Sequence, residues 1–177
     1  MKASGKGFTF VELIIAMGIT FLITLASTTA LFQIFGATDR NNNRLTVARQ
    51  TENAGFWISR DAQRAQGVST SNLTAPDILL LNWMQWDASG NPIYYSARYS
   101  FDNITAANIG RLKRYYWNSL GDNQTTLVGI NLYYNPSDSE NSSMVSYQSP
   151  VITVRLTAIV DKARETREYR IKRRPNV

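Results

Sequence analysis

The chain contains neither cysteine nor histidine. Their absence excludes disulfides, thiolate and imidazole zinc sites, and nucleophile systems built on cysteine or on a serine–histidine pair. Carboxylate or serine–lysine catalysis stays formally open, but no residue pattern points to either chemistry. We therefore expect a protein that is not an enzyme and that has no cofactor and no metal site.

Proline is absent before Pro76, and charge is scarce between residues 8 and 36, where Glu12 is the only charged side chain. About twenty apolar residues are enough to cross the hydrocarbon core of a bilayer. With no proline to interrupt it, a helix is predicted to begin near residue 8 and to place residues 8–36 in a membrane or a fibre core.

The helix is predicted to continue as an amphipathic half over residues 37–67 and to stop near Gly67. Residues 18–29 mix glycine with β-branched residues, and 41–43 are three asparagines, so both stretches are expected to be soft spots. The spacing predicts a narrow apolar stripe at Leu45, Ala48, Gly55 or Ile58, Ala62 and Ala65.

After Gly67 the hydrophobic pattern alternates, which predicts strands. The short links 88–91 and 161–164 suit hairpins and therefore an antiparallel sheet. Residues 68–177 are thus expected to form a sheet domain, and the fold class is α+β, with one long helix packed across the sheet. Strands are predicted at 78–84, 93–101, 111–117, 126–134, 151–160 and 166–174.

Aromatic residues and one long polar segment are the main features of this sheet domain. Residues 136–150 are rich in serine and bounded by prolines, and we expect a structureless surface loop there. The aromatic residues suggest either a sugar or peptide platform or core packing; we favour one member of each tyrosine pair in the core and the other on the open face. They are Trp83, Trp86, Trp117, Tyr94–Tyr95, Tyr115–Tyr116 and Tyr133–Tyr134.

The net charge is +6, and basic residues gather in the last predicted strand. A row of Lys and Arg with an aromatic side chain can contact the phosphates and bases of a nucleic acid. The same residues also suit a solvated edge strand, where charge discourages pairing between sheets, and we favour that interpretation. The residues concerned are Arg167, Tyr169, Arg170, Lys172, Arg173 and Arg174.

The N-terminal segment fits three kinds of targeting sequence. A cleaved secretory signal would use Lys2, Lys6 and the small residues after the apolar stretch, but the apolar run continues beyond them and contains Glu12. An uncleaved anchor fits the length of the run. Its orientation is not fixed by charge, because basic residues also follow the far end of the run, at Arg40, Arg44 and Arg49.

The third kind of sequence is carried by residues 6–13, KGFTFVEL. This segment resembles the processing motif of type IV prepilins. That motif is a short basic leader that ends in glycine, followed by phenylalanine, a glutamate and an apolar helix. The resemblance implies a leader over residues 1–7, with Lys2 and Lys6 as its basic residues. It also implies cleavage between Gly7 and Phe8 by a prepilin peptidase and N-methylation of Phe8.

Glu12 is the charge that this resemblance explains best. In the family the corresponding glutamate sets the register of assembly, and a carboxylate in a membrane helix usually faces a partner. The amine freed at Phe8 would lie level with Glu12 of a neighbouring subunit. An unpaired buried charge penalises misregister more than the pair rewards register, so Glu12 is the expected register residue.

The resemblance further implies a pilin-like fold and a structural role. The order of the helix, the segment WISRDAQRA at 57–65 and the basic end are similar to larger minor pilins and minor pseudopilins, which act in priming or at the fibre tip. The implied partners are other pilin or pseudopilin subunits, the prepilin peptidase that also methylates, and the inner-membrane assembly platform. The precursor would cross the inner membrane once with its C-terminal domain outside the cytoplasm, before entering a surface pilus or a periplasmic pseudopilus.

Three alternatives stay open from the sequence. The chain could be a minor pseudopilin of type II secretion, or a pilin that binds DNA in competence or a surface in adhesion. It could also be a membrane-tethered domain without a fibre role, which would keep its leader.

Overall fold

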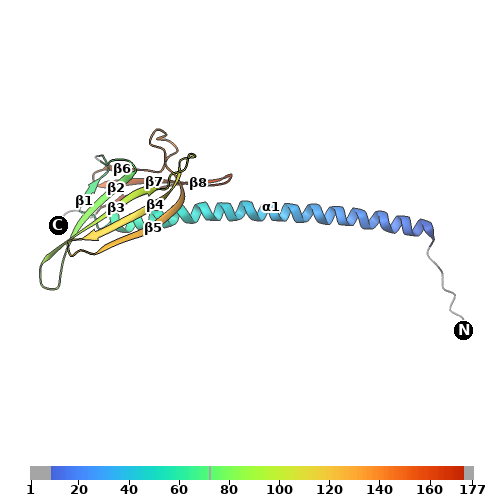
Figure 1. Ribbon diagram of the computed structural model, residues 1–177, viewed down its shortest axis with the longest axis horizontal. Helices are drawn as coiled ribbons and strands as arrows, with labels where there is room; N and C mark the ends of the chain where they lie inside the picture. Colours follow the sequence, from blue (N-terminus) through green and yellow to red (C-terminus); the bar gives the residue numbers. More distant parts are fainter. Residues whose placement is uncertain (1–8, 72, 174–177) are drawn as a thin grey trace. The chain divides into compact units, whose positions relative to one another are not determined.

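The computed structural model describes residues 9–71 and 73–173, and it shows an α+β fold (Figure 1). Within these ranges one helix, α1, precedes eight strands that form one antiparallel sheet. The predicted fold class and strand orientation are therefore confirmed. Lys2, Lys6, Gly7, Phe8 and Arg174 lie outside the described residues.

Helix α1 runs without a break over Phe10–Ala62. It passes through 18–29 and 41–43, where we expected soft spots. In the first stretch Thr24 and Thr28 each donate a side-chain hydrogen bond of 2.8 Å to the carbonyl four residues earlier, so these hydroxyls need no outside partner. The helix ends before Gly67 because the backbone N–H of Gln66 donates to Asn82 O at 2.9 Å and so joins the sheet.

The strand order in the sheet is β1-β2-β3-β4-β5-β7-β6, and β8 pairs with the other edge of β7. Strands β2 to β5 form a meander in which each hairpin links neighbours, as the short links predicted. The strands are β1 Gly67–Ser69, β2 Asp77–Trp86, β3 Pro92–Asp102, β4 Ile109–Asn118, β5 Asn123–Tyr133, β6 Met144–Gln148, β7 Val151–Val160 and β8 Ala163–Lys172.

Two strands differ from the sequence prediction. β1 has three residues, too few to show an alternating pattern. The expected structureless loop at 136–150 is wrong in its second half, because Met144–Gln148 form β6 and pair with β7. The serine-rich composition hid this strand, yet Val145 and Tyr147 alternate with polar residues and pack against the core.

The described chain forms two units that divide after Asn42. In the first unit, the apolar side chains of α1 are exposed along the helix. In the second unit, the last turns of α1 pack on the inner face of the sheet. Figure 1 shows the strands as a layer over this part of the helix.

The buried stripe of α1 differs partly from the predicted one. Gly55, Ile58 and Ala62 are buried as expected, whereas Leu45 is 45% exposed. Burial begins at Val47 instead and continues through Thr51 and Ala54. The three- and four-residue steps are those of a helix face, so the period was right and the starting position was wrong.

Side chains of α1 also hydrogen-bond to the backbone of β5. Strand β5 meets β7 at a single residue pair, Leu132 and Ala158, which leaves part of its edge without a strand partner. There the Asn53 amide donates to Val128 O at 2.8 Å, and Gln50 Oε1 accepts from the N–H of Ile130 at 2.9 Å. These bonds supply the partners that a buried strand edge needs.

Candidate functional site

Glu12 lies in the first turn of α1 and bonds to Thr9. Its Oε2 accepts from the Thr9 backbone N–H at 2.8 Å and from the Thr9 hydroxyl at 2.9 Å, while Thr9 Oγ1 accepts from the Glu12 N–H at 3.3 Å. This reciprocal pattern is a capping box, which satisfies free N–H groups at a helix start. Within residues 9–71 and 73–173, no basic side chain pairs with Glu12.

The helix that follows Glu12 is long and apolar enough to cross a membrane. Its apolar side chains, among them Phe21, Leu22 and Phe32, are exposed. Burying one such side chain is worth roughly 1.5–3 kcal/mol, so this surface is suited to an apolar environment. The unit therefore supports the predicted single membrane-spanning segment.

A buried ion pair joins the end of α1 to the sheet, and sequence reasoning did not find it. Asp61 is fully buried and receives two hydrogen bonds from Arg114, at 2.5 Å from Nε and 3.1 Å from Nη2. The hydroxyl of Tyr99 donates to the same carboxylate at 2.7 Å. The Arg114 guanidinium also lies 5.2 Å from the ring centroid of Trp57.

The protonation of this cluster is fixed by burial and by charge. Burial, followed by the negative charge of Asp61, raises the pKa of Tyr99 well above its usual range, so the phenol remains a donor. Burial alone would lower the pKa of Arg114, but its bonds to Asp61 raise that pKa on balance. The cluster thus holds α1 on the sheet. A sequence signal existed, because Asp61 follows Ile58 by three residues on the buried stripe.

The basic strand β8 presents two faces with different partners. On the inner face Arg167 bonds to Glu52 of α1 at 2.6 Å and to Glu165 at 2.9 Å, and these bonds raise the pKa of Arg167. Tyr169 donates its hydroxyl to Thr51 O at 3.0 Å. These two candidate nucleic-acid residues therefore attach β8 to the helix, an arrangement that favours a structural role.

The remaining nucleic-acid candidates, on β8 and just after it, differ in their exposure and in their partners. Arg170, on the outer face, bonds to Glu168 at 3.0 Å, and Lys172 is exposed. Arg173 donates to the Gln66 carbonyl and lies 5.8 Å from the ring centroid of Tyr147. The candidates thus do not form one uninterrupted basic face among the described residues.

The polar loop before β6 is held by the basic residues of the neighbouring strands. Arg155 donates to the carbonyls of Ser139 and Glu140 at 2.7 and 3.1 Å, and Arg164 donates to Asn141 Oδ1 at 2.7 Å. Two arginines near the C-terminal end thereby serve the fold, and the loop is fixed at three successive residues.

The tyrosine pairs divide between the two faces of the sheet as predicted. Tyr95 and Tyr116 pack with Trp83 on the inner face, with ring centroids about 6 Å apart, whereas Tyr94 is exposed on the outer face. Tyr134 stacks on Phe101 at 4.5 Å. The core interpretation is therefore confirmed for one member of each pair.

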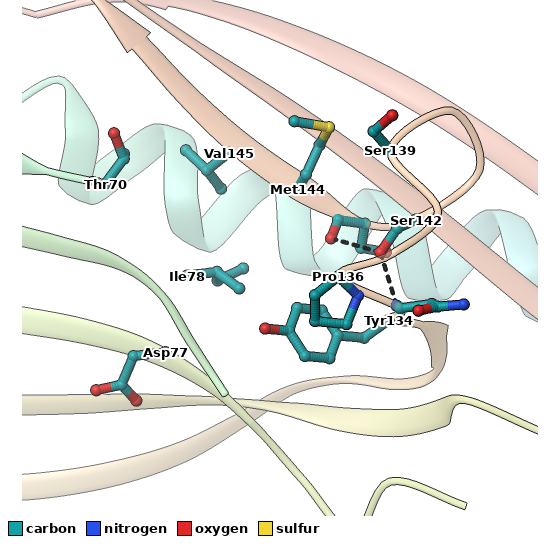
Figure 2. A pocket seen from close by; sticks show the side chains of 11 residues that line it. Thr70, Asp77, Ile78, Tyr134, Pro136, Ser139, Ser142, Met144 and Val145 are labelled. Atoms are coloured by element: carbon teal, nitrogen blue, oxygen red, sulfur yellow. Dashed lines mark hydrogen bonds between the residues drawn. The ribbon is translucent and has the colours of Figure 1, made fainter. Parts of the chain in front are cut away.

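A cavity of about 190 Å³ opens between β2 and the start of β6. Figure 2 shows Asp77 and Ile78 on one side and Met144 on another, with Tyr134 below. Its charged residue, Asp77, pairs with Arg98 at 3.5 Å, and Ser142 Oγ accepts from the N–H of Asn135 at 2.8 Å. Those polar groups already have partners within the domain.

Residues 9–71 and 73–173 contain no group of three or more acidic side chains placed to hold a metal ion. The loop carboxylates Asp87 and Asp122 instead accept hydrogen bonds within their own turns, from the Asn91 backbone N–H and from the Asn118 side-chain amide. Their geometry is that of turn formation.

Comparison of the chain with family profiles, curated proteins and solved structures found no match. The functional argument therefore depends on the chain's own residues. The informative ones are the start of α1, its apolar surface and the outer surface of the sheet domain.

Proposed function

We propose that this chain is a type IV pilin-like structural subunit, with the priming or tip role of a minor pilin. The supporting observation is that the prepilin-like motif at residues 6–13 leads into an apolar helix whose described side chains are exposed. A small α+β domain on the second half of α1 fits the same class of subunit. The apolar helix anchors the precursor in the membrane, and in the fibre the helices of sibling subunits replace the lipid around it.

In this proposal Gly7 and Phe8 form the cleavage site, and Phe8 carries the methylated amine. Glu12 provides the negative charge that this amine meets on a neighbouring subunit. The described chain offers Glu12 a cap at Thr9 but no cation. The carboxylate is thus well oriented and electrostatically incomplete, which is what a register residue requires.

The capping box complicates any simple test of Glu12. Replacing Glu12 with alanine removes both the cap and the charge, so a loss of assembly would not show which one matters. Glutamine keeps the cap, because a capping box accepts Glu or Gln at this position. Glu12→Gln therefore removes the charge alone.

Thr9→Ala is the matched control, since it removes the cap and retains the charge. The experiment measures each variant in the membrane fraction and in fibres sheared from cells that express the full set of sibling subunits. We expect Glu12→Gln to insert into the membrane normally but to be lost from the fibres, and Thr9→Ala to be incorporated. Normal incorporation of Glu12→Gln would contradict the register role.

A further inference from the structure

The outer face of the sheet carries aromatic rings that the core does not use. Register places Ser96 of β3 between Asn82 of β2 and Trp117 of β4. Tyr94 and Trp86 share this face, because alternate residues of a strand point the same way. Trp86 is 65% exposed, Tyr94 is 59% exposed and Trp117 is half-buried. We call these five residues the outer aromatic patch.

The polar members of the patch have unused hydrogen-bonding capacity. Ser96 Oγ donates to Asn82 Oδ1 at 2.8 Å, which fixes the orientation of the amide. The Asn82 Nδ2 hydrogens have no acceptor among the described residues. Gln66, at the adjacent edge of β2, accepts from the N–H of Met84 at 3.1 Å through Oε1, which leaves its amide nitrogen as a further donor beside the patch.

A groove of about 450 Å³ lies beside these groups. Its lining includes Gln66, Asn82, Tyr94 and Ser96, and it contains no charged residue. An aromatic surface with a few well-placed amides and hydroxyls can orient a small polar ligand. The site therefore selects for a ligand that is neutral and rich in hydroxyl groups.

Two cations near the patch, Arg98 and Lys113, each pair with a carboxylate of the same domain. Arg98 pairs with Asp77 at 3.5 Å and lies 5.0 Å from the ring centroid of Tyr115. Lys113 bonds to Asp102 at 2.5 Å, which raises the pKa of the lysine. Each cation thus has a carboxylate of its own chain as its nearest ionic partner.

The turns at this end of the sheet add negative charge. Asp87 belongs to the β2–β3 turn, where its carboxylate accepts from the backbone N–H of Asn91, and Asp122 belongs to the β4–β5 turn, where its carboxylate accepts from the side-chain amide of Asn118. Two carboxylates beside the patch repel a polyanion. This charge distribution argues against nucleic acid and against acidic polysaccharides as ligands of this face.

We propose that the outer aromatic patch binds a neutral polysaccharide. A pyranose ring has a face of C–H groups, which packs on an aromatic ring, and a rim of hydroxyls, which bonds to amides. Trp86, Tyr94 and Trp117 lie on three adjacent strands, so they can contact successive sugar units of one chain. The site belongs to the sheet domain and does not depend on the fibre role.

The test uses the full chain in a zwitterionic detergent, because detergents with sugar headgroups would compete. Cellohexaose and chitohexaose are the neutral probes, and polygalacturonate and duplex DNA are the anionic ones. Titration calorimetry should detect binding of at least one neutral probe. Trp86→Ala and Tyr94→Ala should each raise its Kd about two- to twelvefold, since an aromatic contact is worth roughly 0.5–1.5 kcal/mol.

Two controls separate ring stacking from other effects. Tyr94→Phe keeps the ring and should retain most of the affinity, and Phe56→Ala removes a 61% exposed aromatic on α1 and should bind as the unaltered chain does. Circular dichroism verifies that each variant is folded; Trp86 is at the exposed end of β2, so its replacement should not unfold the domain. The proposal fails if neither neutral probe binds, if the anionic probes bind more tightly, or if the ring variants bind normally.

Discussion

The two parts of helix α1 have opposite surroundings. Up to Phe35 the side chains are mostly apolar and exposed, whereas from Val47 onward the helix is more polar in sequence but buries one face on the sheet. The first part therefore depends on lipid or on other subunits, and the second depends on its own domain. Under the proposed function, this difference separates the residues that would serve assembly from those that stabilise the domain.

Two carboxylates on this helix illustrate the same difference. Asp61 is bound by Arg114 and Tyr99, so its charge is compensated inside the domain. Glu12 has the cap provided by Thr9 but no cation within the described residues. The paired charge of Asp61 therefore stabilises the fold, whereas the charge of Glu12 is the one that the proposed function assigns to a neighbouring subunit.

The largest effect is expected from Asp61→Ala. This change leaves Arg114 buried without its carboxylate, which typically lowers the free energy of unfolding by about 3–5 kcal/mol. Chemical denaturation of the full chain in detergent, followed by tryptophan fluorescence, measures the loss. Glu12→Ala should leave the unfolding of the sheet domain unchanged, and equal effects of the two substitutions would contradict the distinction.

A control variant tests whether any carboxylate would behave like Asp61. Glu140→Ala removes an exposed side chain of the polar loop and should leave the denaturation midpoint unaltered. Arg114→Met combined with Asp61→Leu should recover much of the stability, because an apolar pair of similar volume can replace a buried ion pair. Failure of the double variant to recover would show that the bond to Tyr99 matters more than the ion pair.

Two glycines of α1 provide a smaller and more closely matched comparison. A Cβ at Gly55 would overlap the ring of Tyr169, whereas a Cβ at Gly18 would meet no heavy atom within 4 Å. Gly55→Ala should lower the free energy of unfolding by about 1–3 kcal/mol through overpacking. Gly18→Ala should leave domain unfolding unchanged and add up to about 1 kcal/mol of helix propensity. Denaturation of both variants under the same conditions measures the difference between their free energies of unfolding. If Gly55→Ala is as stable as Gly18→Ala, the predicted overlap with Tyr169 is wrong.

The smallest effect is a pH dependence in the β2–β3 turn of the domain. The backbone N–H of Asn91 above all lowers the pKa of Asp87, so the folded turn favours the ionised carboxylate. Its contribution is present above the ordinary pKa of about 3.9 and is lost as the pH falls through the lower folded pKa. Asp87→Ala should therefore melt earlier than the unaltered chain at neutral pH, and the difference should shrink toward pH 3. A difference that grows on acidification would contradict this assignment.

Local patterns in the sequence predicted most of the fold. The alternation at Tyr95–Phe101 and the short hairpin links gave the sheet, because side-chain period and turn length are local properties. The stripe on α1 was placed wrongly at Leu45, since its start depends on where the sheet ends. Strand β6 was missed because it is stabilised by β7 and not by its own composition.

The candidate site was predictable only at its N-terminal end. Glu12 was apparent because a charge in an apolar run is unusual in any sequence. The Asp61–Arg114 pair was not, because residues far apart in the chain meet only through the fold. The same holds for the outer aromatic patch, where strand register brings Trp117 beside Ser96.

The most direct test of the proposed role is the intact mass of the protein isolated from its own cells. The account predicts a mature chain that begins at Phe8, lacks residues 1–7 and carries one added methyl group, with fragmentation placing that methyl on the Phe8 amine. A chain that retains Met1 through Gly7 in the fully assembled state would contradict it and would favour a membrane-tethered domain without a fibre role.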